Sequence, residues 1–538
     1  MTRFAAMILL ILASMPGREG ADVWPTADVD ARSATFSTHA GAPFSSHEEN
    51  TTLPSRSRSG RSPSSASSAE LSIGARPQAE GPAEWSRFRG PNGSGVADAT
   101  GLPTELGPDR NVIWKTAIPP GYSSPILSER RIFLTAIEDE RLFTLALDRA
   151  SGEVLWKREA PRPRVETLDP RNNPAAPSPA VDGERVYVFF PEFGLLAYDL
   201  DGTELWRMSL GPFDNLYGMG ASPVVHDGVV LLVCDQRTGS FLLAVDGASG
   251  EVVWRVERPE AASSHATPIV WEPEGGEPQL IVVGSFLLSG YSIATGERLW
   301  WVRGMIHEMK SVPVIGDGIV YVNGYGSPLN DPGNTMEVGT FDAALAAHDA
   351  DGDGLLVREE LPEDSRARRR VGMSDLNRDG RLDRRDWEYF RNSMAMTNGM
   401  FAIRLGGSGD MTAASFLWIY SRAVPQLPSP LLYGGVLYMV NDGGIVTILD
   451  PQTGERLDQD RLEGAVDHYY ASPVAADGKI YMVSELGKVA VLTPGPELDL
   501  IAVNDLDDTV YGTPALAGDR IYLRTGTTLY CFGLTDGE

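Results

Sequence analysis

Cysteine is almost absent from this chain: its 538 residues include two, Cys234 and Cys531. The two residues form no zinc-binding motif, because such motifs need several cysteines or histidines at short spacings. Both lie at strand-like positions near the ends of the repeat region described below. Two buried free thiols are therefore expected in preference to a disulfide.

Positive charge is also scarce. The chain has 46 Lys and Arg against 73 Asp and Glu, which gives a formal net charge of −27. A nucleic-acid-binding protein needs basic residues to neutralise phosphates, so this balance excludes nucleic acid as an expected partner.

Long apolar runs are missing except at the N-terminus, where Arg3 precedes an apolar run over residues 4–15. The run is too short to cross a bilayer, and small and polar residues follow it, which is typical of a secretory signal peptide over residues 1–20. No cysteine follows that could carry a lipid anchor. The sequence predicts an exported protein, periplasmic or extracellular, with no transmembrane segment in the mature chain. An N-terminal core helix is the alternative interpretation.

Residues 21–82 have few large apolar side chains and are rich in Ser, Ala, Arg, Gly and Pro. Such a segment cannot bury enough apolar surface to fold, so it is predicted to be a disordered linker. Order is expected to begin near Trp85, where aromatic side chains precede a Pro-Asn-Gly turn.

One unit recurs from Ser124 onward: a small residue and a proline, a turn, two apolar strands, and then a Gly-x-x-x-Trp phrase. Its prolines are Pro125, Pro179, Pro223, Pro268, Pro313, Pro430, Pro473 and Pro514. A matching strand follows each proline, at residues 131–137, 185–190, 229–235, 279–285, 318–324, 436–441, 479–484 and 520–525. Four strands in a unit of about 45 residues are typical of a propeller blade. The predicted fold is all-β: an eight-bladed β-propeller of four-stranded antiparallel blades over residues 83–326 and 399–538, expected to be a monomer.

The last unit stops after its third strand, which would leave an open sheet edge. Residues 111–118 precede the first unit and carry a tryptophan, as the fourth strands elsewhere do. This segment is therefore predicted to complete blade eight, so that the two ends of the repeat region meet.

The repeat phrases resemble those of the pyrroloquinoline-quinone (PQQ)-type propellers, within the quinoprotein alcohol dehydrogenase-like superfamily. Residues 146–156, 197–206 and 244–254 carry the resemblance best, while blades six and seven depart from it, with Leu457 and Asp458 near the expected tryptophan. The sequence is most similar to non-enzymatic PQQ-like repeat proteins and to the propeller subunit of the outer-membrane β-barrel assembly machinery. This resemblance implies a binding role.

A long interval between Pro313 and Pro430 indicates a module inserted in blade five, over residues 327–398. Two helices are expected there, at residues 341–348 and 384–394. Between them, residues 349–360 (the first loop) match the calcium-binding pattern of an EF-hand completely. Its expected ligands are Asp349, Asp351, Asp353, the Leu355 carbonyl and Glu360. Residues 375–386 (the second loop) offer Asp375, Asn377, Asp379, the Arg381 carbonyl, Asp383 and Asp386.

The second loop ends in Asp386, where EF-hands carry a bidentate Glu. The shorter side chain is expected to weaken calcium binding or to relax selectivity toward magnesium. Leu356 and Leu382, at equivalent positions of the two loops, are expected to pair. The loops start closer together than in a standard EF-hand pair. Calcium is the predicted cofactor, with a stiffening role, and acidic surface loops without an ion are the alternative.

The loops that enter each blade are expected to surround one mouth of the central channel. They carry Tyr122, Tyr217, His265, His307, Glu308, Lys310, His468, Tyr469, Tyr470 and Tyr511. These residues are predicted to form a polar, aromatic pocket for a peptide or small ligand. The alternative is that each one caps a strand or fills the channel.

In PQQ-dependent dehydrogenases of the resembling family, the quinone lies between an aromatic floor and a disulfide of adjacent cysteines, with a calcium ion and an Asp base. This sequence has no adjacent cysteines, and the Asp and ion ligands match no position. PQQ is therefore not expected. The first hypothesis is a non-catalytic scaffold that binds a protein or an envelope component. The others are a PQQ-dependent alcohol or sugar oxidoreductase and a sugar-binding propeller.

Overall fold

The computed structural model describes residues 85–215 and 217–534. The chain divides into two units, residues 1–72 and 73–538, and all described residues belong to the second. The predicted signal peptide and the whole of the predicted linker thus lie outside the described residues. Within the described part, no helix combines the length and the apolar character needed to span a membrane.

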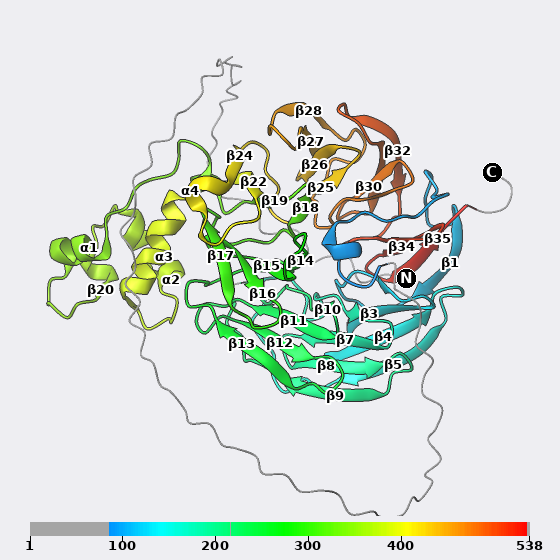
Figure 1. Ribbon diagram of the computed structural model, residues 1–538, viewed down its shortest axis with the longest axis horizontal. Coiled ribbons are helices and arrows are strands. Elements are labelled where there is room, and N and C mark those ends of the chain that lie inside the picture. The colour runs from blue at the N-terminus through cyan, green and yellow to red at the C-terminus, as the bar shows by residue number, and fades with distance from the viewer. Residues whose placement is uncertain (1–84, 216, 535–538) are drawn as a thin grey trace, which may run out of the picture. The chain divides into compact units, whose positions relative to one another are not determined.

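Eight antiparallel sheets are arranged radially around a central hub (Figure 1). Blades one and two contain β2 (Ile126–Leu127), β3 (Arg131–Glu138), β4 (Arg141–Asp148) and β5 (Val154–Ala160), then β6 (Ala180–Val181), β7 (Arg185–Phe190), β8 (Gly194–Asp199) and β9 (Glu204–Ser209). Blades three and four contain β10 (Val224–His226), β11 (Val229–Cys234), β12 (Phe241–Asp246) and β13 (Val252–Glu257), then β14 (Ile269–Trp271), β15 (Gln279–Gly284), β16 (Leu287–Ser292) and β17 (Arg298–Arg303).

Blades five and six contain β18 (Val314–Gly316), β19 (Ile319–Gly324), β22 (Gly399–Arg404) and β24 (Phe416–Tyr420), then β25 (Leu431–Tyr433), β26 (Val436–Asn441), β27 (Ile445–Leu449) and β28 (Arg456–Arg461). Blades seven and eight contain β29 (Val474–Ala476), β30 (Lys479–Val483), β31 (Lys488–Thr493) and β32 (Asp499–Asp505), then β33 (Ala515–Ala517), β34 (Arg520–Arg524), β35 (Thr528–Phe532) and β1 (Val112–Ala117). The prediction of an eight-bladed propeller of four-stranded sheets is confirmed. Blade four gains a short parallel strand on its outer edge, β23 (Gly409–Asp410), followed by the one-turn helix α4 (Thr412–Ser415).

The middle strands of each blade read as continuous apolar runs because both of their faces are covered by neighbouring blades. β7 and β12, for example, are buried almost throughout. The outermost strands instead alternate between exposed and partly covered residues, as in β1 and β32. The apolar core is therefore divided among the spaces between blades.

The Gly-x-x-x-Trp phrase joins neighbouring blades. The Trp156 indole of blade one donates to the Leu200 carbonyl of blade two at 2.9 Å. A Cβ at Gly202 would lie 2.7 Å from the Trp156 ring, and Gly202 has a positive φ of 82°, so this position needs glycine. Trp300 differs from this pattern, because its indole donates within its own blade, to Gln279.

The ring closes through strand β1, as the sequence predicted. β1 pairs antiparallel with β35, so that Trp114 lies opposite Cys531. The two cysteines are free and buried, on β11 and β35. The sequence expectation of free thiols is confirmed.

A belt of hydroxyl groups links the blades at the hub. In each unit the residue before the repeat's proline is Ser or Thr, except for Val312 in blade five. Its backbone N–H donates to the hydroxyl of the equivalent residue in the next unit, except for Thr267, because Val312 offers no hydroxyl. Seven such bonds of 2.9–3.0 Å join residues 124, 178, 222, 267, 312, 429, 472 and 513. We call these residues the hub belt. It explains why a hydroxyl residue precedes seven of the eight prolines of the repeat.

Residues 85–96, with the short helix η1 (Pro91–Gly93), lie across the hub and are called the plug (Figure 1, blue). Trp85 pairs with Leu127 of blade one, and Asn92 exchanges hydrogen bonds with Val270 of blade four. Arg89 is fully buried and donates to the Pro430 carbonyl of blade six at 2.8 Å. The plug therefore ties together blades that are far apart in sequence.

The insertion between β19 and β22 is helical. It contains η2 (Pro328–Asn330), α1 (Phe341–His348), β20 (Leu356–Val357), η3 (Arg358–Glu360), α2 (Arg366–Ser374), β21 (Arg381–Leu382) and α3 (Arg384–Ala395). The two predicted helices are present, and α3 extends one residue further than expected. Helix α2 was not predicted. The insert has its own apolar core, around Phe341, Leu356, Leu382, Trp387 and Phe390.

Candidate functional site

A cavity of about 230 Å³ opens at one mouth of the hub. Every blade contributes to its wall. The lining residues include Tyr122, Asp169, Arg171, Asn172, Tyr217, His265, Lys310, Gln426, Tyr470 and Tyr511. Six of the residues predicted from the sequence thus come together here: Tyr122, Tyr217, His265, Lys310, Tyr470 and Tyr511.

The floor of the cavity is formed by the plug and the hub belt. Phe88 of the plug lines it together with Thr267, Ser429 and Ser472 of the belt. Phe88 lies between two arginines that donate to backbone carbonyls of blades four and six. The floor is consequently fixed by contacts that tie the plug to blades four and six.

One side of the cavity is aromatic. The Tyr122 and Tyr511 rings stack with centroids 4.0 Å apart and an interplanar angle of 20°, and the Tyr470 ring lies 5.2 Å from that of Tyr511. The Tyr511 hydroxyl donates to Glu485 Oε1 at 2.9 Å. Burial and this carboxylate raise the pKa of Tyr511, which therefore stays a neutral hydrogen-bonding group at the mouth.

The opposite side carries paired charges. Lys310 Nζ lies 3.1 Å from Glu308 Oε2 and 4.9 Å from the centre of the Tyr217 ring. Burial opposes ionisation of Glu308, but Lys310 together with His307 and His265 outweighs this effect and holds the pKa of Glu308 below its usual range. Burial, assisted by Lys310, lowers the pKa of His265 to about 4, so its imidazole is neutral near pH 7. The His265 ring contacts Tyr217 edge-on, with centroids 5.7 Å apart.

Four predicted residues lie outside the lining. Glu308 is buried behind Lys310, and His307 is buried against the insert, with its ring 6.2 Å from that of Tyr389 on α3. His468 is exposed and lies 3.3 Å from Asp442. Tyr469 is buried and donates to the Ala465 carbonyl within the same loop, so its hydroxyl is used inside the loop.

The sequence did not single out Phe88, Asp169, Arg171, Asn172 or Gln426 as lining residues. Arg171 forms two hydrogen bonds with Asp169, at 2.8 and 3.0 Å, and Asn172 donates to the Tyr217 carbonyl. The first proline interval, from Pro125 to Pro179, is longer than the other ordinary ones. The extra residues form the segment before blade two, which contributes Asp169, Arg171 and Asn172 to the wall. The sequence therefore did contain a signal for this part of the cavity, in the length of that interval.

The first loop of the insert has a compact arrangement of carboxylates. Oxygens of Asp349, Asp351 and Asp353 lie within 4.8 Å of one another. Asp349 accepts hydrogen bonds from the N–H groups of Gly352 and Gly354. The two oxygens of Glu360 accept from residues 350 and 357, each at 2.9 Å.

The second loop repeats this arrangement. Asp375 accepts from Asp379 N–H and Gly380 N–H, and Asp386 accepts from the N–H groups of Leu376 and Asp383. The loops are joined by β20 and β21, in which Leu356 lies opposite Leu382, as expected. These oxygens, with the Leu355 and Arg381 carbonyls, are the type of donor that calcium takes.

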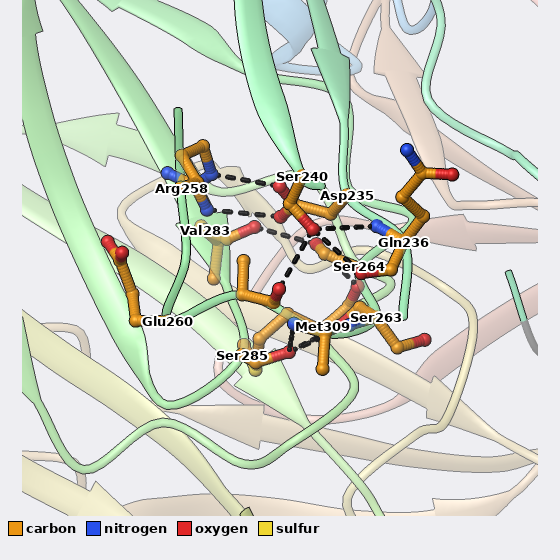
Figure 2. A network of polar contacts seen from close by, with 12 residues as sticks. Asp235, Gln236, Ser240, Arg258, Glu260, Ser263, Ser264, Val283, Ser285 and Met309 are labelled. Carbon is orange, nitrogen blue, oxygen red and sulfur yellow. Dashed lines mark hydrogen bonds and ion pairs between the residues drawn. The ribbon is translucent and has the colours of Figure 1, made fainter. Parts of the chain in front are cut away.

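A buried polar network fixes the segment that carries His265 (Figure 2). Arg258 forms a bidentate pair with Asp235, at 2.8 and 3.0 Å. Ser285 accepts from Ala262 and Ser263 N–H, and Ser264 donates to the Val283 carbonyl. Residues 258–265 are thus held between blades three and four along their whole length.

The sequence matches the family described as outer membrane protein assembly factor BamB, over residues 96–233, 192–327 and 242–538. No curated protein matches the chain. BamB from Moraxella catarrhalis is 11% identical, with a TM-score of 0.49, and the match covers 79% of this chain and 99% of that one.

Two oxidoreductases are among the other similar structures. The quinohemoprotein alcohol dehydrogenase ADHIIG from Pseudomonas putida HK5 is 12% identical, with a TM-score of 0.48 over 80% of this chain and 78% of that one. A europium-containing methanol dehydrogenase is 10% identical, with a TM-score of 0.49 over 84% of this chain and 98% of that one. The family match covers most of the residues that form the blades, and the chain therefore belongs to the PQQ-like propeller family described as outer membrane protein assembly factor BamB.

Proposed function

We propose that this protein is an exported, non-catalytic scaffold that binds a protein or an envelope component at the hub mouth and calcium in the insert. The observation that carries the proposal is the cavity to which all eight blades contribute. Stacked tyrosines on one side and paired charges on the other suit a ligand with both apolar and polar parts. The description of the family as an outer-membrane protein assembly factor supports an envelope role.

Calcium would be held by the two loops of the insert. The donors would be the carboxylates of residues 349, 351, 353 and 360 in the first loop and of residues 375, 379 and 386 in the second, with Asn377 and the two backbone carbonyls. Bound calcium would neutralise these carboxylates and stiffen the insert. Calorimetric titration of the apo protein with calcium tests this part of the proposal. Two binding events are expected, and no heat of binding would contradict it.

The residues at the mouth do not fit a quinone site of the dehydrogenase type. That site needs two adjacent cysteines, whereas Cys234 and Cys531 are buried in different blades. Asp169, the carboxylate in the lining, is held by two hydrogen bonds from Arg171. We therefore propose no redox step.

A sugar ligand is the second candidate, and the tyrosine stack favours it. Aromatic faces such as those of Tyr122, Tyr470 and Tyr511 bind the apolar faces of sugar rings, and nearby hydroxyl and charged groups can bind sugar hydroxyls. Binding of an oligosaccharide panel to the purified protein, with no protein partner present, separates this candidate from the scaffold.

The test of the mouth is a capture experiment from envelope extracts with the mature chain as bait. Replacing Tyr511 by Ala is expected to reduce recovery of the specific partner by about tenfold, because buried aromatic side chains dominate interface energies. His468→Ala is the matched control, since His468 is exposed outside the cavity lining. Equal capture by the wild type and Tyr511→Ala would exclude the hub mouth as the binding site.

A further inference from the structure

The second loop runs directly into helix α3, and its last residues form the first turn of that helix. Asp383 caps the helix by accepting the Asp386 N–H at 2.9 Å, and Asp386 accepts from Asp383 in return at 3.2 Å. Asp386, the last expected ligand, therefore lies in the first turn of α3. Tyr389 lies on the same helix, one turn further along.

Tyr389 packs on the propeller next to the candidate pocket. Its ring lies 5.6 Å from that of Phe286 and 6.2 Å from that of His307, in both cases edge-on. Phe286 is in the left-handed region, with φ of 65°, which is uncommon for a residue with a side chain. Its N–H donates to the Ile306 carbonyl, and its carbonyl accepts from Gly304 and Met305. The insert thus supports a strained turn whose partner is the segment 304–306.

That segment continues directly into the charged side of the pocket. His307 Nε2 lies 3.9 Å from Glu308 Oε1, and Glu308 holds Lys310, which lies over the Tyr217 ring. The Met309 carbonyl accepts the His265 N–H at 2.8 Å. Movement at His307 would therefore shift both Lys310 and His265.

A second contact reaches the same pocket from α3. Arg385 donates to the Pro259 carbonyl at 3.1 Å and to the Arg237 carbonyl at 2.8 Å. Pro259 belongs to the segment 258–265 that Figure 2 shows between blades three and four. In contrast, the ion pair of the first loop, between Asp353 and Arg381, stays within the insert.

We infer that Tyr389 is a positioning residue through which calcium in the second loop orders the pocket side that carries Lys310 and His265. The inference rests on the proposed calcium binding and adds a regulation of the proposed site. Without calcium, the Asp386 carboxylate is repelled by those of Asp375 and Asp383, and this repulsion loosens the first turn of α3. With calcium, α3 is fixed and holds Phe286 and His307 in place.

Hydrogen–deuterium exchange of the full mature chain tests the inference, with calcium compared with chelator. Calcium is expected to slow exchange in residues 303–311 by about tenfold, because ordering α3 reduces local opening. Tyr389→Leu keeps an apolar side chain but loses the ring, and is expected to abolish this calcium-dependent difference while calcium binding by calorimetry remains. Tyr389→Phe keeps the ring and should preserve the difference.

Glu360→Gln provides the matched control, since it alters the first loop and leaves α3 intact. The protection of residues 303–311 should survive in this variant. If calorimetry shows the second loop filled while exchange in residues 303–311 is unchanged, the inference is wrong and the proposed calcium site stands. If the protein binds no calcium, the proposed calcium function fails and the inference fails with it.

Discussion

The two acidic loops of the insert have the same internal hydrogen bonds but different surroundings. In both loops the twelfth residue accepts the N–H groups of positions two and nine. At the first and twelfth positions, Asp349 and Glu360 of the first loop are half-buried, whereas Asp375 and Asp386 of the second loop are 5% and 2% exposed. The loop motif fixes the internal geometry, and the rest of the fold fixes how far each loop is removed from water.

Because of this difference, the pKa values of the carboxylates at position twelve of the two loops shift in opposite directions. Backbone N–H groups of Val357 and Ala350 lower the pKa of Glu360. Burial raises the pKa of Asp386 to about 6. The first loop thus presents the more open carboxylates, while the second has covered carboxylates next to α3, which contacts the propeller.

The largest change in calcium affinity is expected when the twelfth residue of the first loop loses its carboxylate. This variant tests whether the two loops bind calcium independently. Glu360→Gln places an amide NH₂ against backbone N–H donors and removes a charged ligand, so the calcium affinity of the first loop should fall on the order of 100-fold, about 2.7 kcal/mol. Calorimetry should show the second binding event unchanged. Loss of both events would contradict the independence of the two sites.

A smaller change in calcium affinity is expected when the twelfth residue of the second loop is given a longer side chain. Asp386→Glu supplies the side chain that binds calcium with both oxygens, and the affinity of the second loop should rise about tenfold, with weaker competition by magnesium. The reciprocal variant, Glu360→Asp, should weaken the first loop. A fall in affinity for Asp386→Glu would mean that the buried site has no room for the added methylene group.

The smallest effect concerns the ion pair that joins the loops. Arg381 Nη1 lies 2.9 Å from Asp353 Oδ2 and would compete for that carboxylate with a bound calcium ion. Arg381→Ala should raise the affinity of the first loop by about threefold, because the pair is partly exposed and screened. The second loop keeps its carbonyl at this position and should not change. Arg384→Ala is the control, since Arg384 pairs with Asp342 on α1.

The blades were predictable because their signals are local and repeated. A hydroxyl residue with a proline marks each entry to the hub, and Gly202 with Trp206 shows how a short phrase encodes a contact between neighbouring blades. Helix α2 was missed because four of its nine residues are arginine, and only Val371 and Ser374 are buried. A helix with so few apolar positions gives almost no periodic signal.

The pocket was predictable only in part. Tyr122 and Tyr511 lie on blades one and eight, and their contact follows once the ring closes. His307 instead faces Tyr389, and the packing of an insert on its host cannot be read from residue spacing. Phe88 reaches the cavity because the plug crosses the hub, which again depends on contacts between segments far apart in sequence.

The pairing of β1 with β35 also constrains the time course of folding. Val112 is synthesised long before its partner Phe532, because the two residues lie far apart in the sequence. Contacts between such distant segments form slowly, and an unpaired strand is prone to aggregate until its partner strand is available. The protein should therefore be most vulnerable during its own production, and removal of the last strand should leave a product that accumulates as aggregates.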